Sequence, residues 1–141
     1  MFFMRYTIDM LSLFPQILFL APAGTTLLRV AAGITILALA WMHYADQEKL
    51  GEEPFIVIGA GKWIPLSASL VELIVGGALV LGAYTQAAAL LGALLALKHV
   101  VWQRRYPNFF PLPRSTTLLL FVICLSLVVS GGGAFAFDLP L

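Results

Sequence analysis

SASLVELIVGGALVLGAYTQ, residues 67–86, is apolar over about the 20 residues that a helix needs to cross a bilayer. One carboxylate, Glu72, lies inside this stretch. An ionisable side chain at membrane depth is costly unless it faces the protein interior and finds a partner there. We therefore expect Glu72 either to hold helices together or to belong to a site.

The composition of the whole chain agrees with a membrane location. Of its 141 residues, 61% are hydrophobic and 11% are charged, whereas soluble domains carry about 25% charged residues. The net charge of +1 predicts no nucleic-acid partner, and the single cysteine, Cys124, excludes an intrachain disulfide and a cysteine-based zinc site. A chain of this length has room for about four spanning helices. The predicted fold class is all-α, an integral membrane four-helix bundle with an N-terminal interfacial segment.

The hydrophobic pattern divides the chain into two parts. Residues 1–22 are interpreted as an interfacial amphipathic segment, because Asp9 and Pro15 interrupt the apolar run that a cleaved signal peptide would need. The signal-peptide alternative stays open. Residues 23–141 are predicted to form the membrane domain, with spans at about 23–44, 64–83, 87–103 and 115–130.

The connections between these spans predict the topology. A short turn at 84–86 makes the second and third spans a hairpin, and the longer loops follow the first and third spans. Most lysines and arginines lie on the side of the two longer loops, which places those loops in the cytoplasm and both termini outside. The expected location is the inner (plasma) membrane, with several passes. The string GAGK at residues 59–62 is not a phosphate-binding loop, because Trp63 stands where serine or threonine is required.

Helical spacing selects the buried polar residues. Arg29 and His43 share one face of the first span with small residues, and His99 shares one face of the third span with Gly92 and Ala96. At ~1.5 Å rise per residue, Arg29, Glu72 and His99 lie ~9, ~16 and ~20 Å below the termini side, so they are predicted to form one buried cluster. Three interpretations remain open: an ion pair that fixes helix register, a ligand or quinone site, or side chains that snorkel to the headgroups.

The same depths disfavour a haem site. His43 is expected at the membrane interface rather than as a ligand. His43 and His99 are predicted at different levels, which disfavours a haem with two axial histidines. No metal-ligand cluster and no catalytic residue set are predicted.

Three segments, in order along the chain, resemble the DoxX family of small membrane proteins. They are LLRVAAG at 27–33, VELIVGGALVLGAYTQAAALLGALLAL at 71–97 and GGGAFAFD at 131–138. The chain departs from that family at 41–44, which reads WMHY where a glycine and a lysine are frequent, and at Ala136, where serine is usual. In the closing segment, 131–133 are expected to end a helix and Asp138 to cap or pair locally.

The resemblance implies a four-helix membrane bundle and an association with redox systems, since the family is named after a subunit of a quinol oxidase or thiosulfate:quinone oxidoreductase. The favoured hypothesis is a small membrane subunit of a quinone-linked redox system, with quinone as ligand and Arg29, Glu72 and His99 as candidate ligand-binding residues. Its partners would be membrane lipid, a redox protein subunit or a second copy of the chain. The alternatives are a non-catalytic scaffold that binds a partner protein and a small oligomeric transporter or channel. A stand-alone enzyme is not expected.

Overall fold

The structure is a computed structural model that describes residues 20–56, 58–133 and 136. Within this part of the chain the only β-type pairing is an isolated bridge between Phe55 and Gly59. The helices are α2 (Ala21–Ala45), α3 (Gln47–Gly51), α4 (Trp63–Leu81), α5 (Thr85–Trp102) and α6 (Arg114–Ser130). The predicted all-α class is confirmed for these residues. The predicted interfacial segment, 1–22, lies outside them except for its last three residues, 20–22, where α2 begins.

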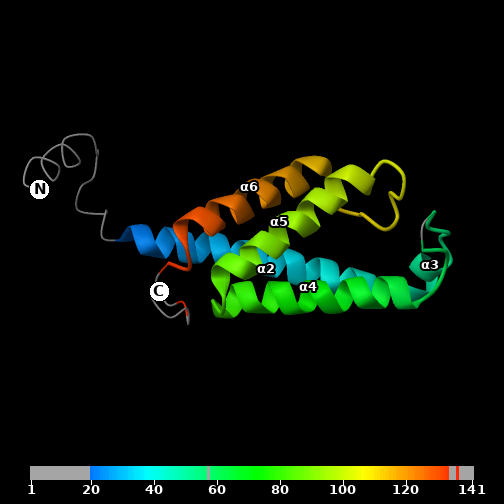
Figure 1. The fold of residues 1–141 in the computed structure, drawn as a ribbon, viewed down its shortest axis with the longest axis horizontal. Helices are drawn as coiled ribbons and strands as arrows, with labels where there is room; N and C mark the ends of the chain where they lie inside the picture. Colours follow the sequence, from blue (N-terminus) through cyan, green and yellow to red (C-terminus); the bar gives the residue numbers. More distant parts are fainter. Residues whose placement is uncertain (1–19, 57, 134–135, 137–141) are drawn as a thin grey trace, which may run out of the picture.

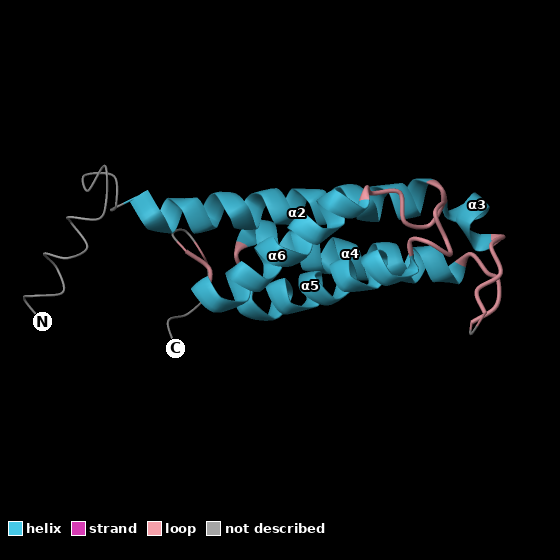
Figure 2. Cartoon of the chain, turned by 90° about the horizontal axis from the view of Figure 1, so that it is seen from above, coloured by secondary structure: helices cyan, strands magenta, loops and turns pink. Residues whose placement is uncertain are grey.

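The long helices lie side by side. α2 packs along α4, and α5 packs along α6 (Figure 1). The two pairs meet where α4 contacts α5 and where α2 contacts α6. Seen from above, α2 and α5 lie at opposite edges (Figure 2). The start of α2, the α4–α5 turn and the end of α6 gather at one end, called the turn end (Figure 1). α3 and the α5–α6 loop lie at the other, the loop end. The two longer loops therefore share one end, as the sequence predicts.

Small residues allow close contact between helices. A Cβ atom at Gly33 of α2 would lie 2.9 Å from the carbonyl oxygen of Gly76 in α4, and a Cβ at Gly76 would lie 3.0 Å from the carbonyl oxygen of Gly33. At Gly92 of α5, an added Cβ would lie 3.1 Å from Cys124 Sγ of α6. Glycines at such crossings let backbones approach to distances that side chains forbid. These contacts set how closely α2 approaches α4 and α5 approaches α6.

The turn between α4 and α5 comes earlier than predicted. α4 ends at Leu81 with Gly82 as its C-cap, in the left-handed conformation (φ 74°), and Tyr84 is also left-handed (φ 49°). The amides of Gly82 and Ala83 both donate to the carbonyl of Ala78, as in common glycine-terminated helix ends. α5 then begins at Thr85. The predicted turn at 84–86 is wrong by two residues because Gly82 ends the preceding helix.

Apolar side chains cover the outside of the helices. Leu27, Ile74 and Val129 are 71%, 63% and 88% exposed, and many leucines of α4, α5 and α6 point outward in the same way. A helix that is hydrophobic all round is typical of a membrane span. α2, α4 and α5 are long and apolar enough to cross a membrane, and α6, with 17 residues, is just shorter.

Aromatic side chains close the loop end. The Phe55 ring lies 4.5 Å from that of Tyr106 and 5.1 Å from that of Phe109, so the α2–α4 connection packs on the α5–α6 loop. The buried members of this loop-end cluster are Leu50, Ile64, Tyr106, Phe109 and Phe110. On the exposed side, Lys62 Nζ lies 2.9 Å from Glu48 Oε1 and lowers the pKa of that carboxyl group. The loop-end cluster lies between the helix interior and this exposed surface.

Candidate functional site

Three buried polar side chains meet near the loop end of the helices. His43 comes from α2, Glu72 from α4 and His99 from α5, and they are 1%, 0% and 2% exposed. One potential ligand atom of each lies within 4.8 Å of those of the other two. We call these residues the His–Glu–His cluster. It contains two of the three residues predicted to cluster, Glu72 and His99, together with one that was not, His43.

The predicted positions of the two histidines are corrected by this arrangement. Their ring centroids are 6.1 Å apart, so His43 and His99 lie at a common level. His43 is also buried rather than placed at the membrane interface. Counting residues along ideal helices predicted different levels because it took no account of helix crossing. The sequence feature that could have predicted burial of His43 is its helical face, which it shares with the buried residues Ile36 and Ala40.

Hydrogen bonds determine which nitrogen of His43 carries a proton. Its Nε2 lies 2.9 Å from the carbonyl oxygen of Phe109, which can only accept, so Nε2–H donates. Its Nδ1 lies 2.6 Å from Glu72 Oε2. One proton must lie between these two atoms, since two lone pairs would otherwise face each other. The pair is either a carboxylic acid with an imidazole or a carboxylate with an imidazolium, and the two forms differ only in the position of that proton.

The His99 ring, like that of His43, is oriented by a hydrogen bond to a backbone carbonyl oxygen. Its Nδ1 lies 2.9 Å from the carbonyl oxygen of Leu95, one turn earlier in α5, so Nδ1–H donates. In the neutral ring, Nε2 then carries the lone pair. Within the described part of the chain, neither His99 Nε2 nor Glu72 Oε1 has a hydrogen-bond partner. Because buried polar atoms are nearly always hydrogen-bonded, these two atoms indicate a site that takes a further group.

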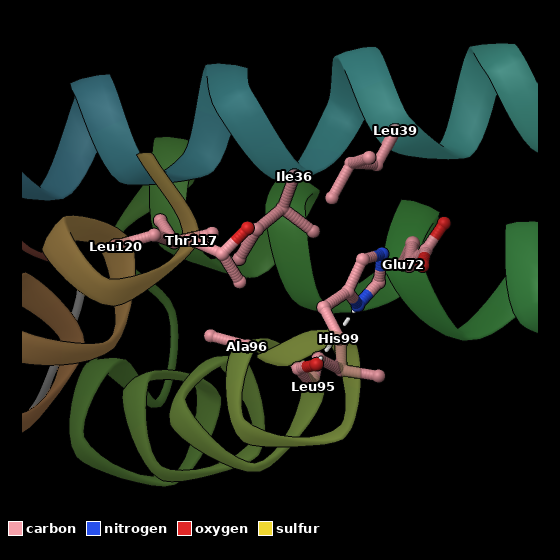
Figure 3. A pocket seen from close by; sticks show the side chains of 8 residues that line it. All are labelled: Ile36, Leu39, Glu72, Leu95, Ala96, His99, Thr117 and Leu120. Atoms are coloured by element: carbon pink, nitrogen blue, oxygen red, sulfur yellow. Dashed lines mark hydrogen bonds between the residues drawn. The ribbon is translucent and has the colours of Figure 1, made fainter. Parts of the chain in front are cut away.

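The two residues that carry these atoms, Glu72 and His99, both line a small cavity. It has a volume of about 10 Å³, which is about the room that one water molecule needs. Figure 3 shows the His99 ring and the Glu72 carboxylate beside this cavity, beneath Ile36 and Leu39 of α2. The remaining lining residues are Leu95, Ala96, Thr117 and Leu120. The cavity is therefore apolar except for Glu72, His99 and Thr117, whose hydroxyl donates to the carbonyl of Pro113.

Two phenylalanines cover the cluster on its loop-end side. The Phe109 ring centroid lies 4.6 Å from that of His43, and the Phe110 ring meets His99 edge-on at 4.6 Å. The Nζ of the half-buried Lys98 lies 5.8 Å from the Phe110 ring centroid, a distance that permits a cation–π contact. The Lys98 charge also interacts with Glu72. Lys98 is thus a cation close enough to act electrostatically on this carboxylate.

Arg29 lies elsewhere, at the turn end. Its guanidinium donates to the carbonyl oxygen of Gly132 at 3.0 Å and lies against Gly82. Gly82 follows Glu72 by ten residues, which is ~15 Å along a helix. The predicted contact between Arg29 and Glu72 is therefore not made. Instead, Arg29 joins α2 to the α4–α5 turn and to the segment that follows α6.

No family model, no curated protein and no solved structure matches the chain. The resemblance to DoxX proteins stays a prediction from the residues quoted above.

Proposed function

We propose that this protein is a multi-pass inner-membrane protein of the DoxX type that serves a quinone-linked redox system as a small subunit. In this proposal, the His–Glu–His cluster exchanges a proton with a quinol hydroxyl group, and electrons pass to a partner redox subunit. The single observation that carries the proposal is the pair of buried, unpartnered atoms, His99 Nε2 and Glu72 Oε1, on two residues that line one small cavity among apolar helices.

The membrane location is supported by the apolar exterior of the helices and by the lengths of α2, α4 and α5. α6 serves as a fourth span in this proposal, since its 17 residues cover ~25 Å at ~1.5 Å per residue. Bilayers thin locally to accommodate a span of this length. Arg104, Arg105 and Arg114 lie next to the loop end, which favours the cytoplasmic side for that end.

The proposed chemistry is general base catalysis. Oxidation of a quinol releases protons at membrane depth, where water is scarce. His99 Nε2 is the proposed acceptor because Nδ1–H donates to the Leu95 carbonyl, which leaves the lone pair on Nε2 unpartnered. The resulting imidazolium would lie beside the Glu72 carboxyl group, which stabilises positive charge when it is ionised. A cavity of about 10 Å³ admits one hydroxyl group, so the quinol ring would stay outside the cavity, on the side of the half-buried Leu95.

Quinone retention tests the proposal. The full chain is purified in mild detergent with a chelator present, and quinone per protein is measured by extraction and mass spectrometry. The wild-type protein should retain quinone in a fixed ratio, and His99→Ala and Glu72→Gln should reduce it. Ser69→Ala is the matched control, because it removes a buried hydroxyl of α4, one turn before Glu72, that donates to the carbonyl oxygen of Ala40 in α2.

Equal retention by the wild type, His99→Ala and Glu72→Gln would contradict the proposal. A protein partner that co-purifies in a fixed ratio without quinone would also contradict it and would favour the scaffold alternative.

A further inference from the structure

We infer that the His–Glu–His cluster is a binding site for one divalent transition-metal ion, with Zn²⁺ as the best match. The ligands would be His43 Nδ1, His99 Nε2 and one carboxylate oxygen of Glu72. This inference does not rest on the proposed link to quinones, because it concerns only the donor atoms and their surroundings.

The donor set is the first argument. Two imidazoles and one carboxylate form a common zinc-binding combination, in which a water molecule completes the coordination. The three ligand atoms already lie within 4.8 Å of one another. Ligands of a tetrahedral zinc ion lie about 3.3 Å apart, given metal–ligand bonds of ~2.0–2.1 Å. The longest of these distances must therefore shorten by at most ~1.5 Å, and His43 Nδ1 and Glu72 Oε2, now 2.6 Å apart, must separate by ~0.7 Å if both bind the ion.

The second argument comes from the groups behind the ligands. Histidines that bind metals nearly always donate their other ring N–H to a carbonyl or carboxylate oxygen, which orients the ring. Both histidines do so here: His43 Nε2 faces the Phe109 carbonyl and His99 Nδ1 faces the Leu95 carbonyl. Of the remaining nitrogens, His43 Nδ1 lies 2.6 Å from Glu72 Oε2, and His99 Nε2 has no hydrogen-bond partner in the described part of the chain.

The cavity supplies the third argument. Its volume of about 10 Å³ beside Glu72 and His99 is enough for about one water molecule. That water would take the fourth coordination position. The aromatic cover of Phe109 and Phe110 and the apolar lining exclude further water, which strengthens the attraction between the ion and the carboxylate.

Because His43 and Glu72 share a proton, metal binding can be measured as proton release. A metal ion on His43 Nδ1 must displace the proton that lies between this atom and Glu72 Oε2, 2.6 Å apart. Binding should therefore release about one proton per ion at a pH where the bound water stays neutral, and affinity should rise with pH. A metal ion also uses the lone pair of His99 Nε2, so Zn²⁺ and a quinol hydroxyl would compete for the cluster.

The test is titration of the full chain with Co²⁺ and Zn²⁺. The protein carries a purification tag without histidine, is stripped with a chelator and contains no added quinone. We expect saturation at one Co²⁺ per chain with the absorption bands of a tetrahedral site, and displacement by Zn²⁺. Calorimetry in buffers of different ionisation enthalpy should give about one proton released per ion.

His99→Ala should weaken Co²⁺ binding more than about 100-fold, since even the partners of metal ligands are worth about 10–100-fold. This variant leaves the His43–Glu72 hydrogen bond in place. Cys124→Ala is the matched control, because it removes the only thiol, and it should bind Co²⁺ as the wild type does. Absence of saturable binding at millimolar Co²⁺, equal binding by His99→Ala, or binding without proton release would each overturn the inference. The proton count on the wild type decides the question even if the variant does not fold.

Discussion

Replacing Glu72 with leucine should destabilise the protein strongly. The bond from Glu72 to His43 is 2.6 Å long, and both side chains are at most 1% exposed. Leucine removes the carboxyl group and leaves His43 Nδ1 buried without a partner. Removing one member of a buried, hydrogen-bonded pair costs about 3–5 kcal/mol when the groups are charged. Leaving a buried neutral group unpaired costs about 1–3 kcal/mol, so we expect Glu72→Leu to lower the free energy of unfolding by about 1–3 kcal/mol for the neutral pair and about 3–5 kcal/mol for the charged pair.

Replacing Glu72 with glutamine separates the contribution of the hydrogen bond to stability from that of the charge. The Phe109 carbonyl keeps the proton of neutral His43 on Nε2, so the amide of Glu72→Gln can donate to Nδ1. A neutral hydrogen bond then replaces one in which a partner can be charged, and the two differ by about 1 kcal/mol. Glu72→Gln should therefore be much milder than Glu72→Leu.

Reversible unfolding by SDS in mixed micelles, with a chelator present, measures these differences. A double-mutant cycle with His43→Leu should give a coupling free energy of about 0.5–3 kcal/mol, because the two side chains are in direct contact. Ser69→Ala is the reference variant. It removes one buried hydrogen bond to the Ala40 carbonyl and should lower the free energy of unfolding by about 1 kcal/mol. Equal stability of the leucine and glutamine variants, or additive effects of Glu72→Leu and His43→Leu, would refute the reasoning.

Three further outcomes are expected. Gly76→Ala should lower the unfolding free energy by about 1–3 kcal/mol in the same assay, because its Cβ would overlap α2, while Gly77→Ala, with open space around its Cβ, should not destabilise. The effects of Arg29→Leu and Glu72→Leu should add within about 0.5 kcal/mol, since the two side chains share no contact; a larger coupling would contradict the separation described here. Lys98→Met should tighten Co²⁺ binding in the calorimeter because it removes a positive charge that acts on Glu72; unchanged or weaker affinity would argue against a cation at the cluster.

The fold was largely predictable because its determinants are local and repeat along the chain. Apolar runs of spanning length predicted the positions of α2, α4, α5 and α6 to within two residues at most ends. Small residues at helical spacing predicted the contact surfaces, as Gly33 and Gly76 demonstrate. The α4–α5 turn was misplaced because the pattern of hydrophobicity does not reveal which glycine adopts a left-handed conformation. Gly82 does so, and this ends α4 at Leu81.

The site was predicted only in part because it depends on how helices cross. Glu72 and His99 were selected correctly as buried polar residues that lie together, since each occupies a small-residue face of an apolar helix. Arg29 was assigned to Glu72 by depth, yet its long side chain bonds to the carbonyl of Gly132 at the turn end. His43 was assigned to the membrane interface because it lies near the end of its span. The folding of the α5–α6 loop over that end, with Phe109 against His43, is a long-range contact that no local pattern reveals.

The surroundings of the cluster determine what it can bind. The cavity beside Glu72 and His99, about 10 Å³ in volume, is too small for the rings of quinone or haem, so its size restricts occupants to a water molecule, a hydroxyl group or an ion. Charge then acts in two directions, because Glu72 attracts a cation while Lys98 repels it. A proton satisfies the His43–Glu72 pair at little electrostatic cost, whereas a divalent ion adds positive charge that the single carboxylate cannot neutralise. Metal binding at this cluster therefore depends on loss of the proton shared by His43 and Glu72. The shared proton and the metal ion exclude each other.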